Sequence, residues 1–124
     1  MDNVATVNGA YEAFGRGDIA AVLDILADDI EWSSPATLPH GGQFKGKAGV
    51  GEFFQGIGAL WASLQLDIEG VSPLSSDSVV GVVAASGELR SGGPAGYGAA
   101  HVFTFANGKV TRFYEYVDLD KPLA

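Results

Sequence analysis

The residues best suited to chemistry lie in the last third of the chain, where His101 and Glu115 stand on either side of an Asn-Gly pair. Two runs rich in aromatic and β-branched residues flank this pair, and that pattern predicts a β-hairpin. An imidazole titrates near neutral pH, and a carboxylate can hold or release a proton. Together among phenylalanines, the two groups could transfer protons in an apolar pocket.

The register of the hairpin decides whether the two groups meet. A two-residue Asn-Gly turn puts His101 and Glu115 on opposite faces, because a one-residue slip moves a whole strand to the other side. A loop one residue longer, with the glycine in the left-handed conformation of a bulge, pairs Phe105 with Lys109 and puts His101 and Glu115 on one face. We favour the longer loop, because it collects three phenylalanines and a valine on the face of a sheet with one buried side.

Helical spacing in the first half predicts the elements that position this hairpin. A first helix ends at the glycines of 15–17, a second follows the N-cap Asp18 and ends at 28–29, and a third runs over about 47–63. A short strand at 30–33 and a loop at 35–46 separate the last two helices. Four more strands are predicted at 66–74, 78–89, 95–105 and 109–118. Helices followed by an antiparallel meander indicate an α+β fold.

Length and composition set limits on the function. The 124 residues, 47% of them apolar, suit a single domain over 1–124 with one core. A net charge of −8 disfavours nucleic acid and anionic membranes as partners. No cysteine is present, the two histidines lie far apart, and no nucleotide-binding motif occurs, so we expect no metal and no cofactor. Without a signal-peptide pattern or a long apolar run, we expect a cytoplasmic protein.

The sequence resembles the SnoaL-like polyketide cyclases and ketosteroid isomerases of the nuclear-transport-factor-like superfamily. The resemblance lies in residues 10–18, 26–32, 44–54 and 101–118. It implies a cone, in which a curved antiparallel sheet wraps around three N-terminal helices and encloses a deep apolar pocket. It also implies a homodimer formed through the outer face of the sheet.

The resemblance assigns roles to individual positions. At the strand position of His101 the cyclases and isomerases carry an aspartic acid that interacts with the substrate oxygen or moves its proton. Glu115 resembles the aspartate on the final strand of limonene epoxide hydrolases. The general base of the isomerases would fall at Ser34, which cannot take a proton from carbon unaided. Their tyrosine would fall at Ala10, so Tyr11 is expected to point elsewhere.

The expected pocket has aromatic walls. Six rings on the predicted helix and strands could bind a flat apolar ligand, and small residues beside them favour a cavity over a filled core. These rings and Ser34 are the predicted substrate contacts: Trp32, Ser34, Phe54, Trp61, Tyr97, Phe103 and Phe113. His40 is expected to be a solvated histidine in a loop at the pocket mouth.

These observations favour a cofactor-independent protein that binds a small or polycyclic apolar carbonyl compound. His101, assisted by Glu115, would move a proton in an isomerisation, a cyclisation or a dehydration. A non-catalytic ligand-binding protein, in which His101 is a hydrogen-bonded core histidine, remains an alternative. A hydrolase that uses Glu115 to activate water is another.

Overall fold

The computed structural model describes residues 2–35, 38 and 40–117, and their elements confirm the α+β prediction. The elements are α1 (Asn3–Gly15), α2 (Ile19–Asp24), β1 (Leu26–Ser34), β2 (Gly42–Lys45), α3 (Gly46–Leu60), β3 (Trp61–Ser75), β4 (Ser78–Leu89), β5 (Pro94–Ala106) and β6 (Lys109–Val117). In this part of the chain, six strands form one sheet in the order β2-β1-β6-β5-β4-β3. The sheet is mixed, because β1 runs parallel to β6 while the other pairs are antiparallel.

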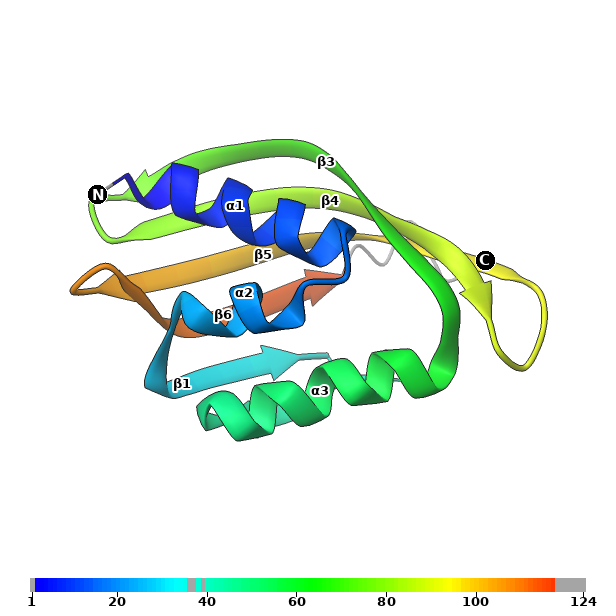
Figure 1. Ribbon diagram of the computed structural model, residues 1–124. Coiled ribbons are helices and arrows are strands. Elements are labelled where there is room, and N and C mark those ends of the chain that lie inside the picture. The colour runs from blue at the N-terminus through cyan, green and yellow to red at the C-terminus, as the bar shows by residue number, and fades with distance from the viewer. Residues whose placement is uncertain (1, 36–37, 39, 118–124) are drawn as a thin grey trace.

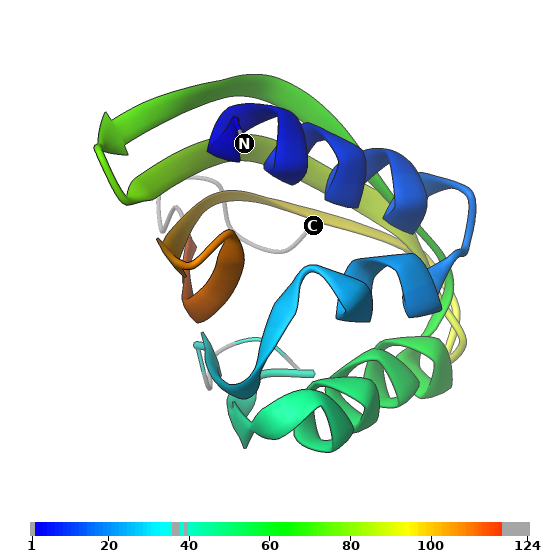
Figure 2. The same ribbon diagram turned by 60° about the vertical axis from the view of Figure 1, so that its left-hand side comes forward.

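The sheet curves around the helices. Figures 1 and 2 show α1, α2 and α3 on its concave side. Helix α1 packs on β3 and β4, while α3 packs on β1, β2 and β3. The strands β3 and β4 thus lie against α1, and β1 and β2 lie against α3. No helix of the described residues is long and apolar enough to cross a membrane.

Two of the predicted helices are shorter than expected. The carboxylate of Asp18 accepts a hydrogen bond from the backbone of Ala21, as an N-cap should, but α2 already ends at Asp24. From Leu26 onward every second residue tends to be buried, as in a strand. The chain follows this alternation and does not continue the helical spacing of α2. Similarly, α3 ends at Leu60, where β3 begins. The predicted loop before α3 contains the short strand β2, which pairs with β1.

The hairpin between β5 and β6 corrects the predicted turn. Asn107 and Gly108 both have positive φ, 53° and 77°, and form a two-residue turn in which Ala106 pairs with Lys109. Such a turn matches the twist of the flanking strands. The predicted longer loop is therefore wrong, and the predicted end of the last strand at Asp118 lies outside the described residues.

An irregularity within β6 restores the predicted face. Thr111 is an extra residue between the pairs that β6 makes with Phe105 and Thr104. One extra residue turns the rest of a strand over, so His101 pairs directly with Glu115. The prediction that these two residues share a face is confirmed, although a bulge in the strand achieves it and not a longer loop.

The core occupies the space between the helices and the concave face of the sheet. One cluster lies between the helices α1 and α3 and the strands β1, β4, β5 and β6, and the other surrounds Trp61 with residues of β4 and β5. The first cluster contains Val7, Leu26, Ile30, Trp32, Val50, Phe53, Val79, Phe103, Phe105, Val110 and Phe113. Tyr11 and Ile57 pack against both clusters.

Candidate functional site

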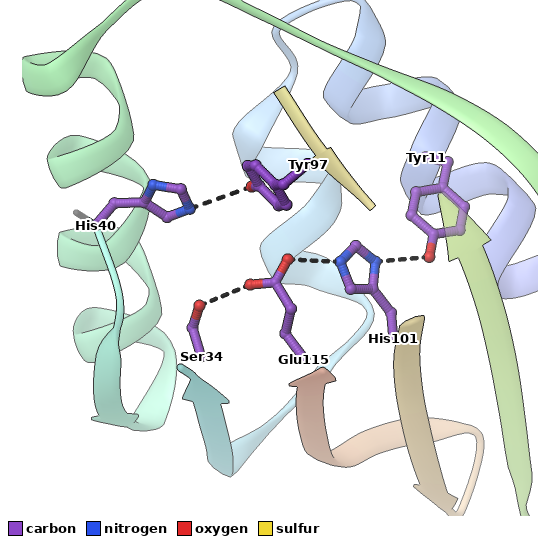
Figure 3. A network of polar contacts seen from close by, with 6 residues as sticks. All are labelled: Tyr11, Ser34, His40, Tyr97, His101 and Glu115. Carbon is purple, nitrogen blue, oxygen red and sulfur yellow. Dashed lines mark hydrogen bonds and ion pairs between the residues drawn. The ribbon is translucent and has the colours of Figure 1, made fainter. Parts of the chain in front are cut away.

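A chain of four hydrogen-bonded side chains lies on the concave side of the sheet (Figure 3). Tyr11 Oη is 2.8 Å from Nδ1 of His101, and His101 Nε2 is 2.9 Å from Oε2 of Glu115. The hydroxyl of Ser34 donates to the other carboxylate oxygen of Glu115 at 2.6 Å. The exposed fractions of Ser34, His101 and Glu115 do not exceed 9%. The chain is therefore a buried polar network whose members satisfy one another.

Strand pairing brings three of these residues together. His101 on β5 lies directly opposite Glu115 on β6. On the other side of β6, the parallel pairing with β1 aligns Ser33 with Tyr114, so Ser34 comes next to Glu115. The fourth member, Tyr11, comes from α1, which crosses the concave face over β4. Four separate elements therefore build one constellation.

The hydrogen bonds assign the protons. An ionised carboxylate only accepts, so His101 Nε2–H donates to Glu115. In a neutral ring the other nitrogen then accepts, so the hydroxyl of Tyr11 donates to Nδ1. Burial, followed by the nearby charge of Glu115, raises the pKa of Tyr11 far above neutral pH, and this keeps the phenol protonated. Both imidazole nitrogens are thus engaged within the protein.

The surroundings of Glu115 favour its ionised form. Burial by itself raises the pKa of this carboxyl, but the hydrogen bond from His101, the charge that His101 carries when protonated, and the Ser34 hydrogen bond all lower it. The lowering effects outweigh burial, and the pKa of Glu115 lies below its ordinary value. Each carboxylate oxygen retains a second lone pair, so ionised Glu115 can still accept a proton from a ligand.

A second polar group surrounds His40. The sequence predicted a solvated histidine here, but the side chain is buried. Only 6% of its surface is exposed. The indole N–H of Trp61 donates to its Nδ1 at 3.2 Å, and its Nε2 lies 3.4 Å from the hydroxyl of Tyr97. Burial lowers the pKa of His40, although the charge of Glu115 acts in the opposite direction. His40 is therefore a neutral residue of the pocket interior.

Both groups border an apolar cavity. Its volume is about 70 Å³, counted for the centre of a water-sized sphere, and one water needs about 10–15 Å³ on this basis. The cavity can hold several waters or a compact ligand, and a larger ligand requires the walls to move. Its lining consists of Ala10, Tyr11, Phe14, Val22, Trp32, His40, Phe53, Phe54, Ile57, Leu64, Leu66, Tyr97, His101, Phe103, Phe113 and Glu115.

The predicted substrate contacts divide into two sets. Five of the six predicted aromatic walls border the cavity, and among them Trp32 stacks on Phe113 with 3.8 Å between ring centroids. Trp61 and Ser34 are placed behind this lining, where they hydrogen-bond to His40 and Glu115, which do border it. Among the described residues, no three histidine, aspartate or glutamate side chains gather in a way that could hold a metal ion.

Tyr11, like His40, lies elsewhere than the sequence predicted. The resemblance located the site-facing position of α1 at Ala10, but the Tyr11 hydroxyl reaches His101. The space for this hydroxyl comes from Gly81 on β4, which pairs with His101 across the sheet. A Cβ atom at Gly81 would overlap Tyr11 Oη. A glycine opposite His101 indicates that a side chain from a helix can approach the sheet there. This pairing follows only from the register of β4 and β5.

Substituting Gly81 with alanine should therefore move Tyr11 away from His101. We expect a changed ¹⁵N chemical shift at His101 Nδ1, and a loss of about 1–3 kcal/mol in unfolding free energy from overpacking. NMR and urea denaturation measure the two effects. Gly70→Ala on β3 is the matched control, because a Cβ atom there meets nothing within 4 Å. An unchanged shift in Gly81→Ala would contradict this role of Gly81.

The fold is that of NTF2-like proteins. The chain is 30% identical to an NTF2-like protein of unknown function from Burkholderia pseudomallei K96243, over 95% of this chain and 92% of that one, with a TM-score of 0.86. It is 25% identical to TerC, crystallised with polyporic acid, over 94% and 91% of the two chains, with a TM-score of 0.81. Against a candidate polyketide cyclase from Xanthomonas campestris pv. campestris, the identity is 26%, the coverage 94% and 90%, and the TM-score 0.79.

The family follows from sequence. The model of the SnoaL-like domain matches residues 7–113, and the chain belongs to this family. No match is found among curated proteins. The matched span includes Tyr11, Ser34 and His101, whereas Glu115 lies just beyond its end.

Proposed function

We propose that this protein binds a small apolar carbonyl compound in the cavity and catalyses proton transfer at the carbon next to the carbonyl, without a cofactor. The observation that carries the proposal is the hydrogen-bonded pair of His101 and Glu115, 2.9 Å apart and buried in the wall of an apolar cavity. An ionised base in such a place can take a proton from carbon without competition from bulk water. Isomerisation, cyclisation and dehydration all begin with this step.

The contacts suggest how the pair divides the work. Both nitrogens of His101 are engaged, so the group proposed to take the proton is the carboxylate of Glu115. His101 and Ser34 hold the carboxylate in place and keep it ionised. This differs from the sequence-based expectation, in which the imidazole itself moves the proton and Glu115 assists it.

The relatives support a pocket for ring compounds. TerC was crystallised with polyporic acid, and another relative is a candidate polyketide cyclase. The cavity here accepts a single ring more readily than a polycyclic compound, which would need the aromatic walls to move apart. We therefore place small ketones first among the substrates to be tested.

Hydrogen–deuterium exchange tests the proposal without knowledge of the natural substrate. Acetophenone, 1-indanone and 2-tetralone are incubated with the protein in D₂O, and loss of the α-hydrogen signal is followed by ¹H NMR. We expect exchange above the rate with heat-unfolded protein. Because the pKa of Glu115 is lowered, the rate should fall only at pH values below the ordinary range of a glutamate. Binding of the ketones without exchange would overturn the proposal and favour a non-catalytic binding protein.

We also propose a homodimer through the outer face of the sheet. Val82 and Tyr116 on this face are 42% and 59% exposed, and a shallow hollow between them is lined by small residues of β5. Large apolar side chains that share an exposed face are typical of protein–protein contacts. Sedimentation velocity should show a dimer that Val82→Glu converts to a monomer. A monomeric wild type would contradict this assembly.

A further inference from the structure

We infer that Tyr97 is a hydrogen-bond donor for an oxygen atom of the ligand, and that His40 and Trp61 hold its hydroxyl in this role. The inference rests on the ligand site of the proposed function but does not need proton transfer to occur. It narrows the ligand class to compounds that carry a carbonyl or similar acceptor oxygen in the part of the cavity between Tyr97 and Glu115.

The tautomer of His40 is the first step. The indole N–H of Trp61 can only donate, and it points at Nδ1 of His40 at 3.2 Å. Nδ1 must therefore be the unprotonated nitrogen, and the proton of the neutral ring is on Nε2. A doubly protonated ring would lose the hydrogen bond from Trp61, and both groups are buried.

This tautomer determines the role of Tyr97. Because Nε2 of His40 carries a proton, it donates to the Tyr97 hydroxyl oxygen 3.4 Å away. Figure 3 marks this contact with a dashed line. The hydroxyl proton of Tyr97 is then left over, and within residues 2–35, 38 and 40–117 no acceptor for it is present. Tyr97 is 93% buried and borders the cavity, so the remaining proton has a ligand as its natural acceptor.

The contact with His40 leaves Tyr97 room to adjust. A distance of 3.4 Å is long for a hydrogen bond, and such bonds often shorten when a ligand binds. Burial, followed by the charge of Glu115, raises the pKa of Tyr97, so the hydroxyl remains a donor at neutral pH. Tyr97 and Glu115 line the same cavity, so a ligand oxygen held by Tyr97 shares that cavity with the proposed base. A carbonyl oxygen at Tyr97 would then bring its α-carbon toward Glu115.

A matched ligand pair tests the donor. Acetophenone and α-methylstyrene have nearly the same shape, but only the ketone accepts a hydrogen bond. Their dissociation constants are measured by NMR titration, and the ratio of the two constants is compared between wild type and Tyr97→Phe. We expect the variant to lose about two- to tenfold in preference for the ketone. Tyr116→Phe, the same substitution on the outer face, should leave the ratio unchanged.

His40 is tested as a positioning residue by the same ratio. His40→Gln retains one acceptor and one donor and should keep most of the ketone preference, whereas His40→Leu should lose it to the same extent as Tyr97→Phe. If His40→Leu does not fold, the conservative Tyr97→Phe variant still decides the question.

The outcomes separate this inference from the proposed function. A ratio that is unchanged in Tyr97→Phe, or failure of wild type to bind either compound, would overturn the inference. A shifted ratio without deuterium exchange would support the Tyr97 donor while overturning the proton-transfer proposal. Deuterium exchange together with an unchanged ratio would support the proton-transfer proposal while overturning the Tyr97 donor.

Discussion

Replacing Glu115 with glutamine is expected to slow deuterium exchange at the α-carbon of a bound ketone by about 10²- to 10⁴-fold, the usual contribution of a general base. The amide has nearly the same shape and can still accept from His101 and donate to Ser34, so the fold and the affinity for the ketone should change little. However, a neutral amide cannot take a proton from carbon. ¹H NMR measures the exchange rate, and titration with the same ketone measures the affinity.

Glu69→Gln is the matched control for this experiment, since Glu69 is an exposed glutamate on β3. It should exchange at the wild-type rate. If Glu115→Gln also exchanges at that rate, Glu115 is not the base. If Glu115→Gln instead loses ketone affinity and stability together, the carboxylate serves to hold the fold.

Phe113→Ala should have the largest effect on stability, a loss of about 3–5 kcal/mol in the free energy of unfolding. Phe113 is 3% exposed and stacks on Trp32, with Phe103 and His101 also in ring contact at 5.1 Å between centroids. Its removal leaves a void between β1, β5 and β6 beside the polar network. Typical domains have only about 5–15 kcal/mol of stability. Urea denaturation followed by tryptophan fluorescence measures the loss.

Tyr116→Ala, on the same strand but the opposite face, is the comparison for Phe113→Ala. Its side chain is 59% exposed, so in the monomer the loss should stay within about 0.5 kcal/mol. Similar losses for both variants would show that the rings around the cavity are not packed as a core.

Apart from the short strand β2, the sequence was sufficient to predict the order of elements and the shared face of His101 and Glu115, because helical spacing and strand alternation of apolar residues are both visible in it. The alternation of apolar residues in β5 and β6 identifies the side chains that face the core, even though the predicted turn between the two strands is wrong. What the pattern could not reveal was the bulge at Thr111, since a bulge depends on contacts between strands.

Tyr11 and His40 show where sequence reasoning ended. The Tyr11 hydroxyl has room beside His101 because Gly81, seventy positions away, carries no Cβ atom, and no local period contains that information. His40 follows a proline in a short loop, where solvation is the usual outcome. Its burial results from contacts with Trp61 and Tyr97, which lie 21 and 57 positions away in the sequence.

The position of β6 between β1 and β5 has a consequence for how the molecule is made. β6 is the last described strand in the chain, yet it joins two otherwise separate pieces, β2-β1 and β5-β4-β3. Until it emerges from the ribosome, both pieces present bare strand edges, which are prone to pairing with other chains. A nascent or shortened polypeptide lacking β6 would thus be prone to aggregation. It would also lack Glu115, the last of the four hydrogen-bonded site residues to be synthesised.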